Sequence, residues 1–362
     1  MFEKEVYIAR RQALLERLAG QKGVALFVGN VDAPAQYKDN CYKWRQDSNW
    51  LYFFGINEQR FAATVDLETG EETLYADDFG IDDIIWMGPM PTVRSLADAA
   101  GVARTAPYDA LGAALKGHQV HFLPASRYAT RLTLGKLLGL DPDETTSAGK
   151  GGCPKASAPL VKAVIDLRLV KDAREIALID AACDLGYEMH VKAMDLVKPG
   201  LTERYVAGQV DGVARSLAQG NSFPTIFSQH GEIMHGTPSD ALMEEGRLVI
   251  CDAGCELEGY ASDNTRTMPV SGMFTQKQLD IYKIVEECHD YVLEVARPGV
   301  KWADVHFAVA RMMTVRLKEL GLMKGDVDEA VSAGAHAMFF PHGLGHMMGL
   351  DVHDMEGLGQ IY

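Results

Sequence analysis

Short apolar runs alternate with amphipathic stretches over the first 150 residues of the chain. Apolar positions recur at helical spacing over residues 3–18 and 93–100, which predicts two helices. Strands are expected at residues 23–29, 50–55, 61–66, 72–75 and 119–123, where short apolar or aromatic runs are bounded by turn residues. This pattern predicts an N-terminal α/β domain of residues 1–160.

The remainder of the chain, residues 161–362, contains longer helical patterns. Two of them, at residues 173–197 and 275–296, end at Pro-Gly pairs whose prolines, Pro199 and Pro298, are 99 residues apart. A further amphipathic stretch follows each pair, so the segment reads as an internal repeat with a site between two similar halves. The alternative is coincidence, since Pro-Gly commonly follows a helix.

The segment LVICDAGCELEGYASDNTRTMP at residues 248–269 predicts a hairpin with an acidic centre. Its first strand ends in Asp252 and its second, residues 260–268, contains Asp263. A turn centred between Leu257 and Glu258 makes the two aspartates cross-strand partners, with Cβ atoms about 4.5–5.5 Å apart. Gly259 supplies a position that tolerates an unusual backbone angle.

Two carboxylates at that distance repel each other unless a proton, an arginine or a cation lies between them. Arg266 is three residues beyond Asp263, so strand alternation turns it to the opposite face. A hard divalent ion is therefore the simplest counter-charge. The alternative is a surface hairpin with two solvated aspartates.

Histidines of the second domain gather in two motifs. SQHGEIMHGTPSD contains His230 and His235, and FFPHGLGHMMGLDVHD contains His342, His346 and His353. Two glycines between the first two histidines of the second motif favour a loop over a helix. Each histidine alone is more commonly a hydrogen-bonded interior residue, but their grouping near an acidic hairpin favours metal binding or proton transfer.

Composition narrows the class of protein further. With 362 residues and 47% hydrophobic content the chain is typical of a two-domain globular protein, and a net charge of −15 disfavours nucleic-acid binding. The six cysteines form no zinc or redox motif, and no apolar run approaches 18 residues, so we expect a cytoplasmic protein without a membrane partner. The AGKGG stretch at residues 148–152 lacks the ending of a phosphate-binding loop and is interpreted as an ordinary loop.

DAGCELEGYASDNTRT and PHGLGHMMGLDVHD resemble the signature segments of the pita-bread metallopeptidases. That group includes aminopeptidase P, prolidase and, more distantly, methionine aminopeptidase and creatinase. RQDSNWLYFFG at residues 45–55 is similar to a segment of aminopeptidase P and prolidase. The resemblance implies a creatinase-N-like α/β domain followed by an α+β pita-bread catalytic domain.

By position in these motifs, the resemblance implies that Asp252 binds one of two divalent ions, that Asp263 bridges both and that His346 is a third ligand. A mainly oxygen ligand set with one histidine favours manganese over a structural zinc.

The resemblance also implies catalytic and substrate-binding roles for three other histidines. His235 would lie beside the scissile bond, and His342 and His353 would contact the proline side of the substrate. The implied partners are peptides with proline in second position, and homo-oligomerisation is left open.

Two further glutamate ligands of the family pattern are expected after the last histidine motif, but the sequence ends at Tyr362 before either. The pita-bread domain is thus expected to be incomplete at its C-terminus, with weak metal binding and low activity. Three functions stay open: an aminopeptidase that cleaves N-terminal Xaa-Pro bonds, an Xaa-Pro dipeptidase, and an inactive truncated relative with a binding or structural role.

Overall fold

The computed structural model describes residues 2–146, 153 and 155–358, so the AGKGG stretch lies outside the described residues. The chain divides into two compact units. The first comprises Met1–Ala181, Glu256–Ala261 and Met347–Tyr362, and the second comprises Ala182–Cys255 and Ser262–His346.

A five-stranded mixed sheet forms the centre of the first unit, in the order β4-β3-β2-β1-β5. The strands are β1 (Val24–Val28), β2 (Ala62–Asp66), β3 (Glu72–Tyr75), β4 (Arg104–Ala106) and β5 (Val120–Phe122). The central pairs β1–β2 and β2–β3 are antiparallel, whereas the two edge strands pair in parallel. The expected strands of this domain, apart from residues 50–55, are confirmed.

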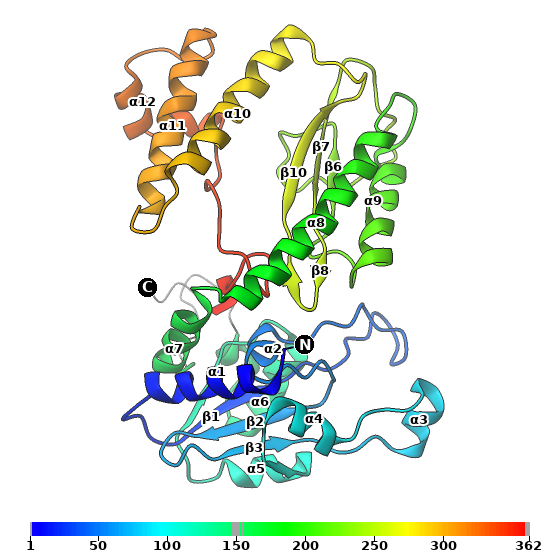
Figure 1. The fold of residues 1–362 in the computed structure, drawn as a ribbon, viewed down its shortest axis with the longest axis vertical. Helices are drawn as coiled ribbons and strands as arrows, with labels where there is room; N and C mark the ends of the chain where they lie inside the picture. The colour runs from blue at the N-terminus through cyan, green and yellow to red at the C-terminus, as the bar shows by residue number, and fades with distance from the viewer. Residues whose placement is uncertain (1, 147–152, 154, 359–362) are drawn as a thin grey trace. The chain divides into compact units, whose positions relative to one another are not determined.

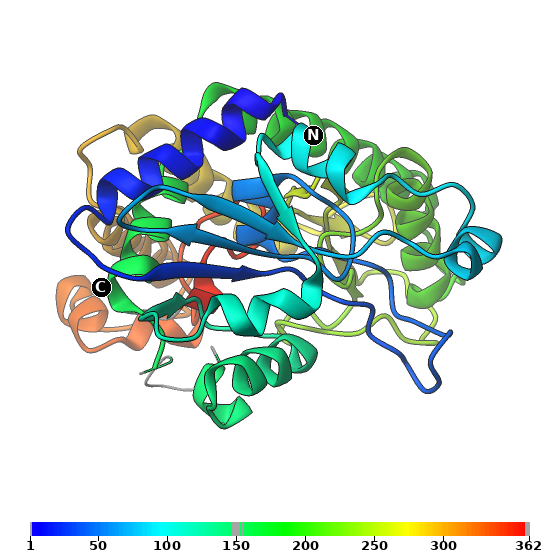
Figure 2. The same cartoon turned by 90° about the horizontal axis from the view of Figure 1, so that it is seen from below.

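Helices cover both faces of this sheet, as Figures 1 and 2 show for α1, in dark blue, and α6, in blue-green. The helices are α1 (Lys4–Arg17), α2 (Ser48–Phe54), α3 (Ile81–Met87), α4 (Val93–Ala100), α5 (Leu111–Ala114), α6 (Tyr128–Leu138) and α7 (Ala158–Arg168), with short 3₁₀ turns at Tyr108–Ala110, Pro142–Thr145 and Glu356–Leu358. Ala25 and Phe27 of β1 pack in one core cluster, and Val24 and Leu26 in another. The alternation follows from the period of two in a strand.

The aromatic run at residues 50–55 is a helix, so the predicted strand is wrong. Asp47 accepts a hydrogen bond from the Trp50 amide and caps the N-terminus of α2, while Gly55 ends the helix with a left-handed backbone at φ 67°. Trp50 and Phe54 are buried on this helix and stack at 4.6 Å between ring centroids. Packing of the aromatic rings in the core outweighs their preference for strands.

The helix α8 (Ala173–Leu196) begins in the first unit and continues into the second. The carboxylate of Asp172 accepts hydrogen bonds from the amides of Arg174 and Glu175 and caps the N-terminus of this helix.

The second unit combines a three-stranded antiparallel sheet, in the order β10-β7-β6, with helices. Its strands are β6 (Ile226–Ser228), β7 (Leu248–Ala253) and β10 (Asn264–Pro269), and its helices are α9 (Glu203–Leu217), α10 (Gln276–Val295), α11 (Trp302–Glu319) and α12 (Val327–Ser332), with a 3₁₀ turn at Ala335–Met338. Residues alternate along β7, so that Val249, Cys251 and Ala253 are fully buried and Asp252 is on the other face. Figure 1 shows α8 crossing this sheet and α10 running beside α11.

The hairpin turn is centred between Glu258 and Gly259, one residue further along the chain than predicted. Thr265, rather than Asp263, pairs with Asp252, and the short strands β8 (Glu256–Leu257) and β9 (Tyr260–Ala261) continue the same register. Glu258 and Gly259 form the turn with φ of 51° and 88°, the positive angles of a two-residue type I′ loop. Asp263 therefore lies diagonal to Asp252, but two residues from Thr265 and so on the same face.

Candidate metal centre and active site

Asp252 is a carboxylate held in an unfavourable environment. Among the described residues, its Oδ1 atom is buried without a hydrogen-bond partner. Burial and the neighbouring carboxylate of Asp263 raise the pKa of Asp252 to about 6, while Thr265 and the charge of His235 oppose the rise. The influences that favour the neutral form of this carboxyl thus outweigh those that favour the charged form.

Asp263 joins this carboxylate to a histidine of the second motif. Nε2 of His346 lies 3.2 Å from Oδ2 of Asp263, and both side chains are partly exposed. Asp252, Asp263 and His346 therefore form a continuous row of side chains in which the middle carboxylate faces both neighbours.

The donor atoms of this row fit a hard divalent ion. Two carboxylates and one imidazole give mainly oxygen ligands, and the unpartnered Oδ1 of Asp252 is an acceptor that a cation would satisfy. Within the described residues, however, no group of three or more His, Cys, Asp or Glu side chains has an arrangement that could hold a metal ion. Shared ligation by Asp252, Asp263 and His346 remains a prediction.

His235 lies on the loop 229–239 that follows β6. Its side chain is exposed, and its charge contributes to lowering the pKa of Asp252. His230, on the same loop, makes an ion pair with Glu232, with 2.8 Å between Nδ1 and Oε1. Of the two histidines of this motif, His235 is thus the better candidate for a role at the acidic pair.

His342 and its neighbours have no regular secondary structure, as the two glycines of the motif indicate. Nδ1 of His342 lies 2.8 Å from the Gly343 carbonyl, and its ring meets the buried Phe340 edge-on at 4.9 Å. A Cβ on Gly345 would approach the Trp302 ring to 3.0 Å, so a side chain at this position would have to displace that ring.

His353 lies in the first unit, on a segment held by buried ion pairs. Asp354 accepts from Nη2 of Arg168 at 2.6 Å and from Nζ of Lys171 at 2.8 Å. Asp351 accepts from the Ser48 hydroxyl at 2.5 Å. His353 itself pairs with Glu356 at 2.7 Å and is half exposed.

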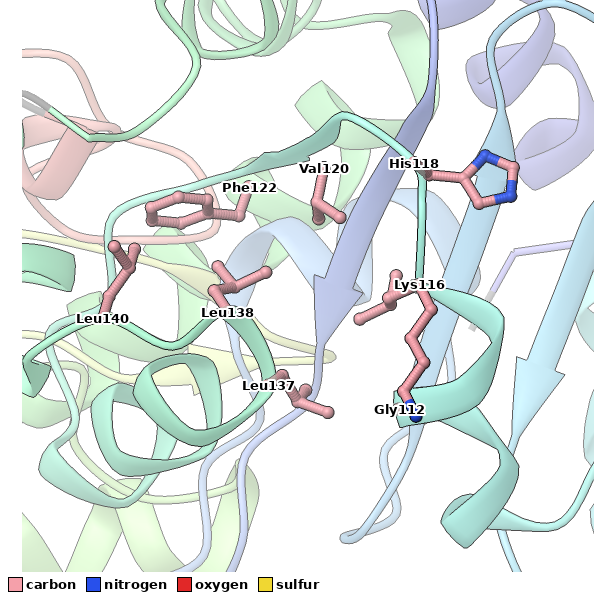
Figure 3. Close-up of a pocket in the computed structure, with 9 residues that line it drawn as sticks. Gly112, Lys116, His118, Val120, Phe122, Leu137, Leu138 and Leu140 are labelled. Atoms are coloured by element: carbon pink, nitrogen blue, oxygen red, sulfur yellow. The ribbon is translucent and has the colours of Figure 1, made fainter.

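The first unit also has an open recess of about 320 Å³, which Figure 3 shows between α5, β5 and α6. Its described lining consists mainly of aliphatic side chains and Phe122, with Lys116 and His118 on one side and no carboxylate. This chemistry does not suit a divalent ion, so the acidic hairpin is the better candidate site.

Two family models match the chain. The model "Metallopeptidase family M24" matches residues 177–361, and "Aminopeptidase P, N-terminal domain" matches residues 7–120. The chain belongs to the M24 metallopeptidase family.

The relatives of this M24 metallopeptidase align with nearly the whole chain. "Xaa-Pro aminopeptidase" from Escherichia coli is 33% identical over 99% of this chain and 82% of that protein. "Probable Xaa-Pro aminopeptidase" from Metarhizium acridum is 28% identical over 98% of this chain and 69% of that protein. The solved structure of aminopeptidase P from E. coli superimposes with a TM-score of 0.85 at 31% identity, covering 100% of this chain and 85% of that one. These findings confirm the pita-bread family and its two-domain fold.

His190 of this M24 metallopeptidase is a residue that the sequence analysis missed. It is buried on α8, with Nε2 3.3 Å from the Ala253 carbonyl and 2.9 Å from the Asn264 carbonyl. Since both partners are acceptors, Nε2 carries the proton, and burial lowers the pKa of His190 so that the ring stays neutral. One imidazole thus links β7, which carries Asp252, to the first residue of β10, which follows Asp263 in the chain.

Glu203 was also missed, although it is only 2% exposed at the start of α9. In the sequence it follows Thr202 and reads as an ordinary first-turn acid of a helix. Its hydrogen bonds to Gln229 and Ser239 are tertiary contacts that no local pattern indicates.

Proposed function

We propose that this M24 metallopeptidase is an Xaa-Pro aminopeptidase that hydrolyses the N-terminal bond of peptides with proline in second position. The observation that carries the proposal is the row of Asp252, Asp263 and His346, in which two carboxylates repel each other and His346 approaches Asp263 to 3.2 Å. The aminopeptidase P N-terminal domain and relatives named Xaa-Pro aminopeptidase supply the substrate class.

We assign the metal-holding role to Asp252, Asp263 and His346, with manganese as the resident ion, because two carboxylates and one imidazole form an oxygen-rich ligand set. A pair of divalent ions, when bound, supplies a water of lowered pKa and polarises the scissile carbonyl.

The chain's own side chains orient the reaction. His346 contacts Asp263 and fixes the direction of that carboxylate. His235 donates a hydrogen bond to the oxygen that gains negative charge in the transition state, and one such donor is worth about 10²–10³ in rate. We also propose that His342 and His353 contact the substrate proline.

Proline gives the reaction its selectivity. Its ring fixes φ near −65° and it offers no backbone N–H, so a rigid contact surface orients an imide bond that general peptidases bind poorly. An alanine in second position has neither the ring contact nor the fixed angle.

The test compares Xaa-Pro-Xaa, Xaa-Pro and Xaa-Ala-Xaa peptides as substrates of the full-length protein with manganese. We expect the proline tripeptide to be turned over at least about 100-fold faster than the alanine tripeptide, since orientation is lost with the ring. Equal turnover of the two tripeptides would contradict the assignment. Turnover of the dipeptide alone would move it to an Xaa-Pro dipeptidase.

We further propose a cytoplasmic location and two structural domains, 1–160 and 161–362. All six cysteines lie in the described part of the chain and none is in a disulfide bond, which suits a reducing compartment. None of the helices in that part has the length and apolar character needed to cross a membrane.

A further inference from the structure

The two ends of the loop 229–239, which carries His235, are joined by one buried carboxylate. Oε1 of Glu203 accepts from the Gln229 amide at 2.7 Å, where the loop begins. Oε2 accepts from the Ser239 hydroxyl at 2.7 Å and from the Ser239 amide at 3.2 Å, where the loop ends. We call Glu203, Gln229 and Ser239 the loop base.

Both oxygens of the Glu203 carboxylate accept hydrogen bonds at the loop base. Burial would raise the pKa of Glu203, but the hydrogen bonds from Gln229 and Ser239 outweigh burial and hold it below the ordinary value. Glu203 therefore stays ionised at neutral pH and accepts charge-assisted hydrogen bonds, which are stronger than neutral ones.

Between its ends the loop has few other anchors. Residues 231–235 are all exposed, and the described contacts inside the loop include a hydrogen bond from the Ile233 amide to the His230 carbonyl at 2.9 Å. Since these exposed side chains bury little apolar surface, the position of His235 depends on how the loop base is closed.

We infer that Glu203 is a positioning residue that sets the location of His235 by closing the loop base. The inference rests on the proposed function for the role of His235 in the reaction. Glu203 does not touch the substrate in this account; it acts through the loop that presents the imidazole.

Three variants separate this role from general stability. Glu203→Gln keeps the shape but sets a donor NH₂ against one of the amides at the loop base. Ser239→Ala removes the hydroxyl, which donates to Glu203 and accepts from the Ala241 amide at 3.2 Å, and leaves Glu203 in place. It covers the case in which Glu203→Gln fails to fold. Glu232→Gln makes the same chemical change on an exposed side chain of the same loop and serves as the control.

Hydrogen exchange of the full-length protein gives a readout that does not depend on activity. We expect Glu203→Gln to speed exchange at the amides of Gln229 and Ser239 by about tenfold or more, with a smaller change in Ser239→Ala and none in Glu232→Gln. Unchanged exchange in both loop-base variants would contradict the inference. The exchange measurement does not depend on activity. If the wild-type protein hydrolyses no Xaa-Pro peptide, the proposed function is contradicted, but the exchange result still tests whether Glu203 closes the loop base.

Kinetics then tests the link to His235. With an Xaa-Pro-Xaa substrate we expect Glu203→Gln to lower kcat by about tenfold with KM nearly unchanged, as for an interaction made in the transition state. In a His235→Ala background the same change is expected to cause no further loss, because the two residues act as a unit. Full additivity in the double variant would overturn the inference.

Discussion

Asp252 in the second unit and Asp354 in the first are both carboxylates with buried oxygens, but their surroundings differ in charge. Asp354 accepts from Arg168 and Lys171, and these cations outweigh burial and hold its pKa below the ordinary value. Asp252 faces another carboxylate and has a buried oxygen without a partner, so its pKa rises to about 6. Asp354 has its cations built into the chain, whereas the environment of Asp252 favours the neutral carboxyl. Under the proposed function, a cation from solution supplies the charge that Asp252 lacks.

The largest expected effect comes from removing the carboxylate that lies between Asp252 and His346. Asp263→Asn is expected to lower kcat/KM for an Xaa-Pro-Xaa peptide by at least about 10³-fold, or about 4 kcal/mol, because the proposed metal ligand is lost. Asp290→Asn, on an exposed side chain of α10, is the matched control and is expected to leave the rate unchanged. Equal rates in the Asp263 variant and the control would show that this carboxylate has no catalytic role.

Removing the charge of Asp354 is expected to destabilise the protein by about 3 kcal/mol, since Arg168 and Lys171 are left without their shared partner. Urea unfolding followed by tryptophan fluorescence measures Asp354→Asn against Asp143→Asn, whose side chain is 83% exposed. For the control we expect the free energy of unfolding to change by less than about 0.5 kcal/mol. A similar change in both variants would remove the distinction between a built-in ion pair and a surface pair.

Asp252→Asn is expected to change the free energy of unfolding in the opposite direction to Asp354→Asn, when the protein has been treated with chelator. A folded-state pKa of about 6 exceeds the unfolded value of about 3.9, so the native state binds more protons between these values and loses stability as pH rises through them. At pH 7 the variant without this charge is therefore expected to be more stable by about 1–3 kcal/mol, and below pH 4 the gain is expected to vanish. Urea unfolding at both pH values checks this, and a variant less stable at pH 7 would contradict it.

Periodicity predicted the face of the acidic pair even though the turn was misplaced. Moving the turn centre by one residue shifts pairing by two positions, which leaves Asp263 on the face of Asp252 because strand side chains alternate with a period of two. The helix α2 was missed because its aromatic side chains favour strands, although Asp47 and Gly55 are ordinary helix boundary signals.

His190 and Glu203 illustrate what local sequence cannot provide. His190 links two strand carbonyls from a helix more than 60 residues away, and Glu203 joins residues 229 and 239 from the start of another helix. Both roles exist only once the chain is folded. The acidic and histidine motifs were found because their residue types carry the chemistry themselves.

Isothermal titration of the chelator-treated full-length protein with manganese tests the central claim most directly. Under the proposed function, metal and proton compete for Asp252. We therefore expect manganese affinity to rise as pH increases through about 6 and to be lost in Asp263→Asn, while Asp354→Asn leaves it unchanged. Manganese affinity that is the same in wild type and Asp263→Asn, or independent of pH from 5 to 7.5, would contradict the account of the acidic hairpin as a cation site.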